Sequence, residues 1–299
     1  GSVTAIGEDG IAFNAGDGQT ISLVTTGDRV RFNGAVELRS DARIDTDGGS
    51  GLGAEIRFTL NATIDSQAAE NNDLTLTAGT EGIVSFNADL GANAALGQLI
   101  VTEAYGVEFG HDPSSADPDL ATMTMVRVDG DLDPLNPDDF DINLGSEGAI
   151  GPGGIRLDAG DGETISFVTS GDRVRFNGQI ELRSDVLVDT TDEGNASGAE
   201  IRFTADAPID SQGGENNDLT LTAGADGTVS FNADLGATFA LGQLIVTEAK
   251  GVAFGNDPGA DPDLGEVSVV RVDGDPLDPD AYGILVGSLA AIGSDGITL

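Results

Sequence analysis

Two acidic stretches contain carboxylates in a pattern that could bind a metal ion. The stretches cover 112–141 and 257–283 and are rich in Asp-Pro pairs and Asp-Gly-Asp runs. Carboxylate oxygens gathered in this way are the ligands that Ca²⁺ prefers, together with loop carbonyl oxygens. The sequence therefore predicts a calcium site in each stretch. The candidate ligands are Asp117, Asp119, Asp129, Asp131 and Asp133 in the first stretch and Asp261, Asp263, Asp273, Asp275 and Asp278 in the second.

The spacing of these carboxylates leaves a second interpretation open. It matches no EF-hand, because the bidentate Glu at the twelfth loop position is absent. It also lacks the tandem nine-residue glycine-aspartate pattern of calcium-binding β-rolls. Asp-Pro pairs start turns, and acidic side chains keep loops hydrated. Calcium binding and plain solvated loops are therefore both hypotheses for the two stretches.

Other catalytic chemistry has little material in this chain. There is no cysteine, and His111 is the only histidine, which removes thiolate chemistry and most general-base and zinc chemistry. Pairs of carboxylates serve glycosidases, but a net charge of −39 would repel an acidic polysaccharide. We therefore predict that the protein is not an enzyme.

The arginines also argue against a catalytic cleft, because they are spread over the predicted strands. An arginine beside Glu37, Asp41 or Glu55 on the outward face predicts a cross-strand ladder of ion pairs, each exposed pair worth about 0 to 1 kcal/mol. The strand arginines are Arg29, Arg31, Arg39 and Arg57, and their counterparts later in the chain are Arg173, Arg175, Arg183 and Arg202.

The composition excludes two classes of partner. The 299 residues include 13 Lys and Arg against 52 Asp and Glu, so the chain has no material for the basic surface that nucleic acid or an acidic membrane requires. No apolar run reaches the roughly 18 residues that a membrane-spanning helix needs. We therefore expect no nucleic-acid binding and no membrane insertion.

An internal duplication divides the chain into repeat units, and each unit contains one of the acidic stretches. TTGDRVRFNG at 25–34 returns as TSGDRVRFNG at 169–178, and 19 of the 21 residues at 84–104 recur at 229–249. The segment GSVTAIGEDGI at residue 1 has related copies at 145 and 287. We therefore expect two repeat units, 1–144 and 145–286, followed at 287–299 by the first strand of a third, truncated unit. On this interpretation the chain is a piece of a longer protein.

Within each unit the pattern predicts short strands and tight turns. Apolar residues alternate with polar ones, no stretch keeps a helical period, and Gly, Asn and Asp end most apolar runs. Phenylalanine recurs in similar frames at Phe13, Phe32, Phe58, Phe86 and Phe109. These features predict an all-β fold, a parallel β-helix (β-solenoid) in which the phenylalanines form a ladder and the asparagines cap turns. The alternative is two tandem antiparallel β-sandwich domains.

The duplicated segments also carry a resemblance. GDRVRFNGAVELRSDARIDTDGG, AEIRFTLNATIDSQ and NNDLTLTAGTEGIVSFNADLGANAALGQLIVTEA resemble the repeats of very large bacterial surface and secreted adhesins of the filamentous haemagglutinin and autotransporter type. The resemblance covers about 20–110 and 164–255. It implies a right-handed parallel β-helix, located at the bacterial cell surface or in a secreted matrix. It supplies no catalytic residue.

These observations predict a function in assembly. We expect a structural repeat segment of a large extracellular bacterial fibre, stalk or matrix protein. Its partners would be adjoining repeats of the parent protein, or a second copy in head-to-tail association. The alternative is a calcium-dependent adhesin module that binds glycans or cell surfaces, with acidic loops repeated every 144 residues in a lateral row that gives avidity.

Overall fold

The computed structural model describes residues 4–7, 9–16, 18–111, 117–130, 140–257, 259, 261–274 and 282–299. These residues form twenty-two β-strands and one short 3₁₀ helix, η1 (Asp192–Gly194). The described part of the chain contains no α-helix, and none of it forms a helix long and apolar enough to cross a membrane. The fold is therefore all-β, as the sequence predicts.

Every strand pairing in the described residues is parallel, and the paired strands form three stacks. Stack 1 contains β1 (Ile11–Phe13), β4 (Val36–Leu38), β7 (Ile64–Ser66), the bridge residue Leu90, β10 (Met125–Val128), β13 (Thr164–Thr169), β16 (Asp185–Asp189), the first halves of β19 (Leu219–Phe231) and β20 (Leu244–Phe254), and β21 (Ile284–Val286). Stack 2 contains β2 (Thr20–Val24), β5 (Asp41–Asp45), the first halves of β8 (Leu74–Phe86) and β9 (Leu99–Phe109), β11 (Ile142–Leu144), β14 (Val174–Phe176), β17 (Ile201–Phe203), the second halves of β19 and β20, and β22 (Gly296–Thr298). Stack 3 contains β3 (Val30–Phe32), β6 (Ile56–Phe58), the second halves of β8 and β9, β12 (Gly154–Leu157), β15 (Ile180–Leu182), β18 (Ile209–Ser211) and the bridge residues Leu235 and Val270.

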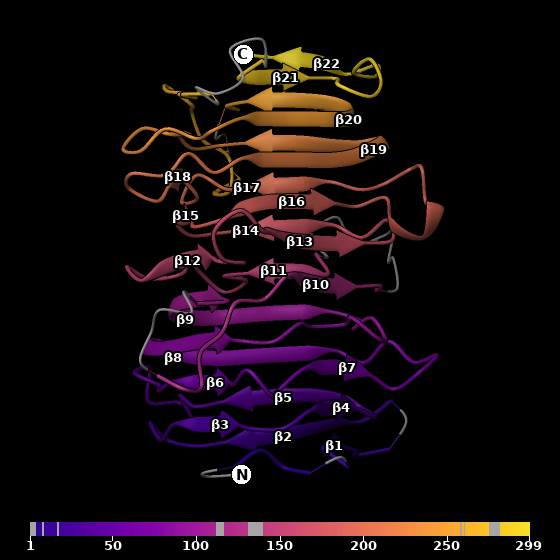
Figure 1. The fold of residues 1–299 in the computed structure, drawn as a ribbon, viewed down its shortest axis with the longest axis vertical. Helices are drawn as coiled ribbons and strands as arrows, with labels where there is room; N and C mark the ends of the chain where they lie inside the picture. Colours follow the sequence, from indigo (N-terminus) through magenta and orange to yellow (C-terminus); the bar gives the residue numbers. More distant parts are fainter. Residues whose placement is uncertain are drawn as a thin grey trace.

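The chain visits the three stacks in a fixed cyclic order. It passes from stack 1 to stack 2 to stack 3 and then returns to stack 1, so each strand pairs with the strand three visits later. The long strands β8, β9, β19 and β20 make two consecutive visits each. Figure 1 shows the resulting elongated stack, with the chain rising from the N-terminal strands to the C-terminal strands. Parallel pairing throughout the described strands does not fit the antiparallel sandwich alternative.

One sequence unit does not correspond to a whole number of turns. The described residues of the first unit visit a stack once with each of β1 to β7, twice with β8, once at Leu90, twice with β9 and once each with β10 and β11, which makes fourteen visits. Because fourteen is not a multiple of three, equivalent strands move to another stack in the next unit. The strand that opens a unit is in stack 1 as β1, in stack 3 as β12 and in stack 2 as β22.

This rotation changes one expectation from the sequence. Loops repeated every 144 residues were expected to form a lateral row on one side of the rod. Equivalent strands of the two units instead lie in different stacks, because β3 is in stack 3 and its counterpart β14 is in stack 2. Equivalent loops of successive units therefore leave the rod from different sides.

A column of phenylalanine rings fills much of the core, as the sequence predicts. Neighbouring rings are stacked with centroids 4.8 to 5.3 Å apart and ring planes within 19° of parallel. The spacing follows from the distance between paired strands. The stacked rings are Phe32, Phe58, Phe86 and Phe109 in stack 3 and Phe176, Phe203, Phe231 and Phe254 in stack 2. The two runs are joined by Phe167, whose ring packs edge-on against Phe109 and Phe176.

The place of Phe13 differs from the predicted ladder. Phe13 is in register with Leu38 of β4 and not with Phe32, because β1 belongs to stack 1. Its ring packs edge-on against Phe32 at a centroid distance of 5.7 Å. The similar sequence frame around each phenylalanine therefore identifies buried strands but does not identify the stack in which a strand lies.

Buried asparagines and tight glycines turn the chain between stacks. The side-chain amide of Asn87 donates to the carbonyl oxygen of Phe58, and Asn232 makes the equivalent bond to Phe203, each at 2.9 Å. Gly34 has a φ of 149°, and a Cβ at this position would lie 2.7 Å from the Cβ of Ile6. The asparagine caps expected from the sequence are therefore present, and the FNG motif needs its glycine.

The ring column predicts a large and position-specific effect on stability. We expect Phe86→Ala to lower the free energy of unfolding by about 3 to 5 kcal/mol, because Phe86 is fully buried between two stacked rings. Urea unfolding measures the change. The control Leu60→Ala alters a side chain that is 43% exposed and should change stability by about 0.5 kcal/mol or less. Equal losses of stability in the two variants would mean that the ring column contributes no more to stability than an exposed side chain does.

Candidate functional site

Two pairs of arginines in register form charged sites in the described residues. Arg31 of β3 lies opposite Arg57 of β6, and Arg175 of β14 lies opposite Arg202 of β17. Like charges directly opposite on neighbouring strands repel each other. Each arginine pair therefore needs carboxylates close by, and the structure supplies them from the two acidic stretches. We call these groups the first and second arginine–aspartate clusters.

In the first cluster the acidic stretch folds back onto stack 3. Arg31 donates to both carboxylate oxygens of Asp119, with Nε 2.6 Å from Oδ2. Arg57 Nη1 donates to Asp117 Oδ2 at 2.6 Å, and Arg57 Nε donates to Glu55 Oε1 at 2.8 Å. Arg31 and Asp119 are 88 residues apart in sequence. The cluster therefore fastens a distant loop to the strands of its own unit.

The second cluster repeats this arrangement on stack 2. Arg175 Nε and Nη2 donate to the two carboxylate oxygens of Asp263 at 2.7 and 2.6 Å, again over 88 residues of sequence. Arg202 Nη1 lies 3.4 Å from Asp263 Oδ2 and 3.7 Å from Asp261 Oδ2. The Arg202 guanidinium also lies over the ring of Phe140, 5.2 Å from its centroid, a cation–π contact.

The second cluster is the more buried of the two. The side chains of Arg175 and Asp263 are 11% and 15% exposed, against 30% and 20% for Arg31 and Asp119. Arg175 Nη1 also donates to Asn143 Oδ1 and to the carbonyl oxygen of Gly145. This guanidinium therefore holds a loop and a neighbouring turn together.

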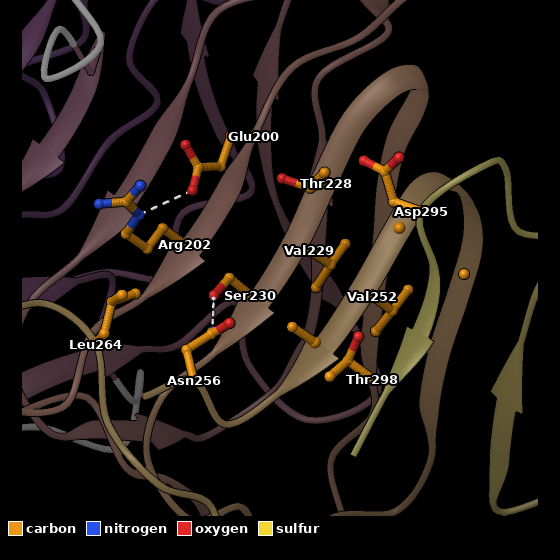
Figure 2. Close-up of a pocket in the computed structure, with 13 residues that line it drawn as sticks. Glu200, Arg202, Thr228, Val229, Ser230, Val252, Asn256, Leu264, Asp295 and Thr298 are labelled. Atoms are coloured by element: carbon orange, nitrogen blue, oxygen red, sulfur yellow. Dashed lines mark hydrogen bonds and ion pairs between the residues drawn. The ribbon is translucent and has the colours of Figure 1, made fainter. Parts of the chain in front are cut away.

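A shallow groove borders the second cluster on the C-terminal side. Figure 2 shows the hydrogen bond from Arg202 to Glu200, with Leu264 of the acidic stretch below Arg202 in this view. Ser230 and Asn256 form a second polar pair along the groove, with 3.1 Å between Ser230 Oγ and Asn256 Nδ2. The carboxylate of Glu200 is engaged by an arginine, so in this groove it serves as an ion-pair partner.

The contacts favour the ionised form of the loop aspartates. Burial is the largest single influence on Asp263 and opposes its charge, but the hydrogen bond and charge of Arg175, followed by those of Arg202, lower its pKa below the ordinary value. The pKa of Asp117 is also lowered, chiefly by the backbone N–H of Asp119. These contributions to stability are therefore present above the unfolded-state pKa of aspartate and are lost as pH falls through the lowered value.

The structure places the predicted calcium ligands in more than one environment. Asp117, Asp119, Asp261 and Asp263 are all paired with arginines. Asp129 follows β10 in stack 1 and accepts a hydrogen bond from the Ser170 hydroxyl, while the backbone N–H of Asp273 donates to the Leu241 carbonyl oxygen. Asp131, Asp133, Asp275 and Asp278 lie outside the described residues.

The described residues do not contain a group of three or more His, Cys, Asp or Glu side chains arranged to hold a metal ion. In the two clusters a guanidinium lies where a cation would approach the carboxylates, and like charges would repel. The calcium hypothesis therefore stays a prediction that depends on carboxylates other than the arginine-bound ones.

The predicted cross-strand ladder of ion pairs is present only in part. Arg29 Nε lies 4.0 Å from Glu55 Oε2 of the neighbouring segment. Arg39 pairs with Glu37 at 2.5 Å and Arg57 pairs with Glu55, but each of these pairs joins residues two positions apart in the sequence. Asp41 instead accepts the backbone N–H of Asp73. The contacts between strand arginines and the acidic stretches are not among the features predicted from the sequence. The signal that could have revealed them is the ADPDL motif, present in both stretches at the same distance from the VRF arginine.

No protein-family model, curated protein or solved structure matches this chain.

The burial of the second cluster predicts strong coupling between its members. In a double-mutant cycle with Arg175→Gln and Asp263→Asn, we expect a coupling free energy of about 1 to 3 kcal/mol, because both side chains are largely desolvated. The exposed pair Arg39 and Glu37 is the control, and its coupling should stay below about 1 kcal/mol. Chemical unfolding of the four variants in each cycle measures both values. Equal coupling free energies in the two cycles would mean that Arg175 binds Asp263 no more strongly than an exposed arginine binds its partner.

A calcium titration separates the two hypotheses for the acidic stretches. Calcium binding predicts saturable heat and a rise in Tm beyond that given by NaCl of equal ionic strength, since a ligand of the folded state adds RT ln(1 + [L]/Kd) to stability. Both effects should disappear in the variant Asp129→Asn, Asp131→Asn, Asp133→Asn. They should persist in the control Asp226→Asn, which alters an exposed carboxylate of β19 outside the two acidic stretches. Solvated loops predict neither heat nor a shift in Tm.

Proposed function

We propose that the chain is a segment of a right-handed parallel β-solenoid that serves as a structural element of an extracellular bacterial fibre, stalk or matrix. The observation that supports this proposal most is the unbroken order of the three stacks. At the junction of the two units, β10 pairs with β13 and β11 pairs with β14 under the same rule as within each unit. Adjacent repeats would therefore continue one another without a linker.

Because each strand pairs with the strand three visits later, each added unit would lengthen the rod by the same amount. In a solenoid each turn contacts only the turns before and after it, so further units lengthen the rod without changing its cross-section. At about 4.8 Å per turn, fourteen visits to three stacks correspond to roughly 22 Å per unit. A repeat of this kind is suited to setting a distance.

The charge of the chain supports a role outside the cell as a spacer. A net charge of −39 makes neighbouring rods repel and keeps them dissolved. The resemblance of the repeats to those of bacterial surface adhesins points the same way. The partners we propose are adjoining units of a parent protein, or a second copy that pairs head to tail with exposed strand edges such as that of β22.

Scattering from an extended chain tests the proposal. We expect a variant in which residues 145–286 are duplicated to be about 22 Å longer than the parent chain, with the same cross-sectional radius. Small-angle X-ray scattering measures both dimensions, and a concentration series reports any head-to-tail association. A larger cross-section at unchanged length would contradict the proposal, since it would mean that units pack side by side.

A further inference from the structure

A groove on stack 3 distinguishes the second unit from the first. It lies between β12, β15, β18 and the loop at 237–240, and its volume is about 210 Å³. Sites for drug-sized ligands usually have about 300 to 1,000 Å³. The groove is therefore of a size for one small ring. Its lining includes Gly153, Arg156, Gln179, Glu181, Asp210 and Phe239.

Several of the differences between the two units lie in this groove. Arg156, Gln179 and Phe239 stand where the first unit has Ala12, Ala35 and Ala94. Two carboxylates of the lining are the same in both units, because Glu181 and Asp210 have Glu37 and Asp65 as counterparts. The segment 229–249 differs from 84–104 at only two positions, Thr238 and Phe239, and both line the groove.

Phe239 is held in a defined position on the rim. The Asp210 carboxylate is 7% exposed and accepts the backbone N–H groups of Thr238 at 2.8 Å and Phe239 at 3.1 Å. The ring lies against Gly213, where a Cβ would be 3.1 Å from ring carbons Cε1 and Cζ. The first unit has Ala68 at that position. The phenylalanine and the glycine that makes room for it therefore occur together, and the ring stays 47% exposed.

A second aromatic ring, that of Tyr105, packs against Gly153 of the groove lining through a similar exchange. A Cβ at Gly153 would lie 2.8 Å from Cδ1 of Tyr105, so the tyrosine ring rests on this glycine. In the next copy of the motif Asp295 replaces the glycine and Lys250 replaces the tyrosine, and these two form an ion pair at 3.2 Å. In each copy the residue at one position is therefore complementary to the residue at the other, as a ring on a glycine or as an ion pair.

The groove is close to neutral on a strongly acidic protein. Arg156 Nη1 lies 2.8 Å from Glu108 Oε1, and its Nε lies 3.4 Å from Glu181 Oε2. Arg183 also pairs with Glu181, at 3.0 Å. The two guanidinium groups thus offset the charges of Glu108 and Glu181, and the Asp210 carboxylate is the third acidic group of the groove. The exposed Gln179 adds a neutral donor and acceptor.

These groups match the chemistry of a neutral sugar. A pyranose ring has an apolar face of C–H groups that packs on an aromatic ring, and hydroxyls that bond to carboxylates, amides and guanidinium groups. An anionic ligand would be repelled by the overall charge, and a basic peptide would be attracted to much of the surface without needing this groove.

We propose that this groove binds a neutral hexose unit of a glycan, with Phe239 against the sugar ring and Arg156, Gln179 and Glu181 bonded to its hydroxyls. The site is separate from the two acidic stretches and needs no calcium. It adds a ligand to the structural role proposed above and does not depend on that role, because the test uses the single chain and not its assembly.

Saturation-transfer NMR with the full chain and the methyl pyranosides of glucose, galactose and mannose tests the proposal. We expect transfer to the ring protons of at least one of these sugars. The variant Arg156→Ala, Gln179→Ala, Phe239→Ala should weaken binding by about tenfold or more. This variant restores the residues of the first unit and should therefore fold, which circular dichroism and Tm check.

Two controls sharpen the result. Leu60→Ala removes an exposed apolar side chain elsewhere and should leave binding unchanged. Added NaCl should also leave it unchanged, because the ligand is uncharged. The proposal is overturned if none of the three sugars receives transfer, if the triple variant binds as well as the parent chain, or if salt abolishes binding.

Discussion

Parallel hydrogen bonding between each strand and the strand three visits later is the interaction on which this structure depends. It places residues of the same type directly above one another along a stack. For apolar residues this is favourable, and the phenylalanine rings stack at the strand spacing over most of the core. Buried asparagines repeat their bonds to the backbone for the same reason.

The same rule is unfavourable for charged residues. Arg31 is placed opposite Arg57, and Arg175 opposite Arg202. The acidic stretches offset this repulsion by laying carboxylates across each pair. Part of the large negative charge therefore has a structural purpose, since Asp119 and Asp263 fasten long excursions of the chain to strands 88 residues earlier.

The mismatch between fourteen visits and three stacks shapes the surface. A rod built from whole turns would present equal loops in a row along one side. Here each unit is rotated relative to the last, so equal loops point in different directions. Near-identical units can also carry different surface residues without disturbing the core. The groove around Phe239 in the second unit is an example.

The all-β class, the duplication, the buried phenylalanines and the turn residues are all predictable from the amino-acid sequence, because each depends on local periodicity or on comparison of the two units. An ion pair between Arg39 and Glu37 is also a local feature, since the two residues are two positions apart. Three other features follow only from the three-dimensional pairing: Phe13 lies outside the ring column, the acidic stretches meet Arg31 and Arg175, and the units rotate between stacks. These features depend on how many visits to the stacks separate two residues. Loop lengths set that number, and the alternation of apolar residues along a strand carries no record of it.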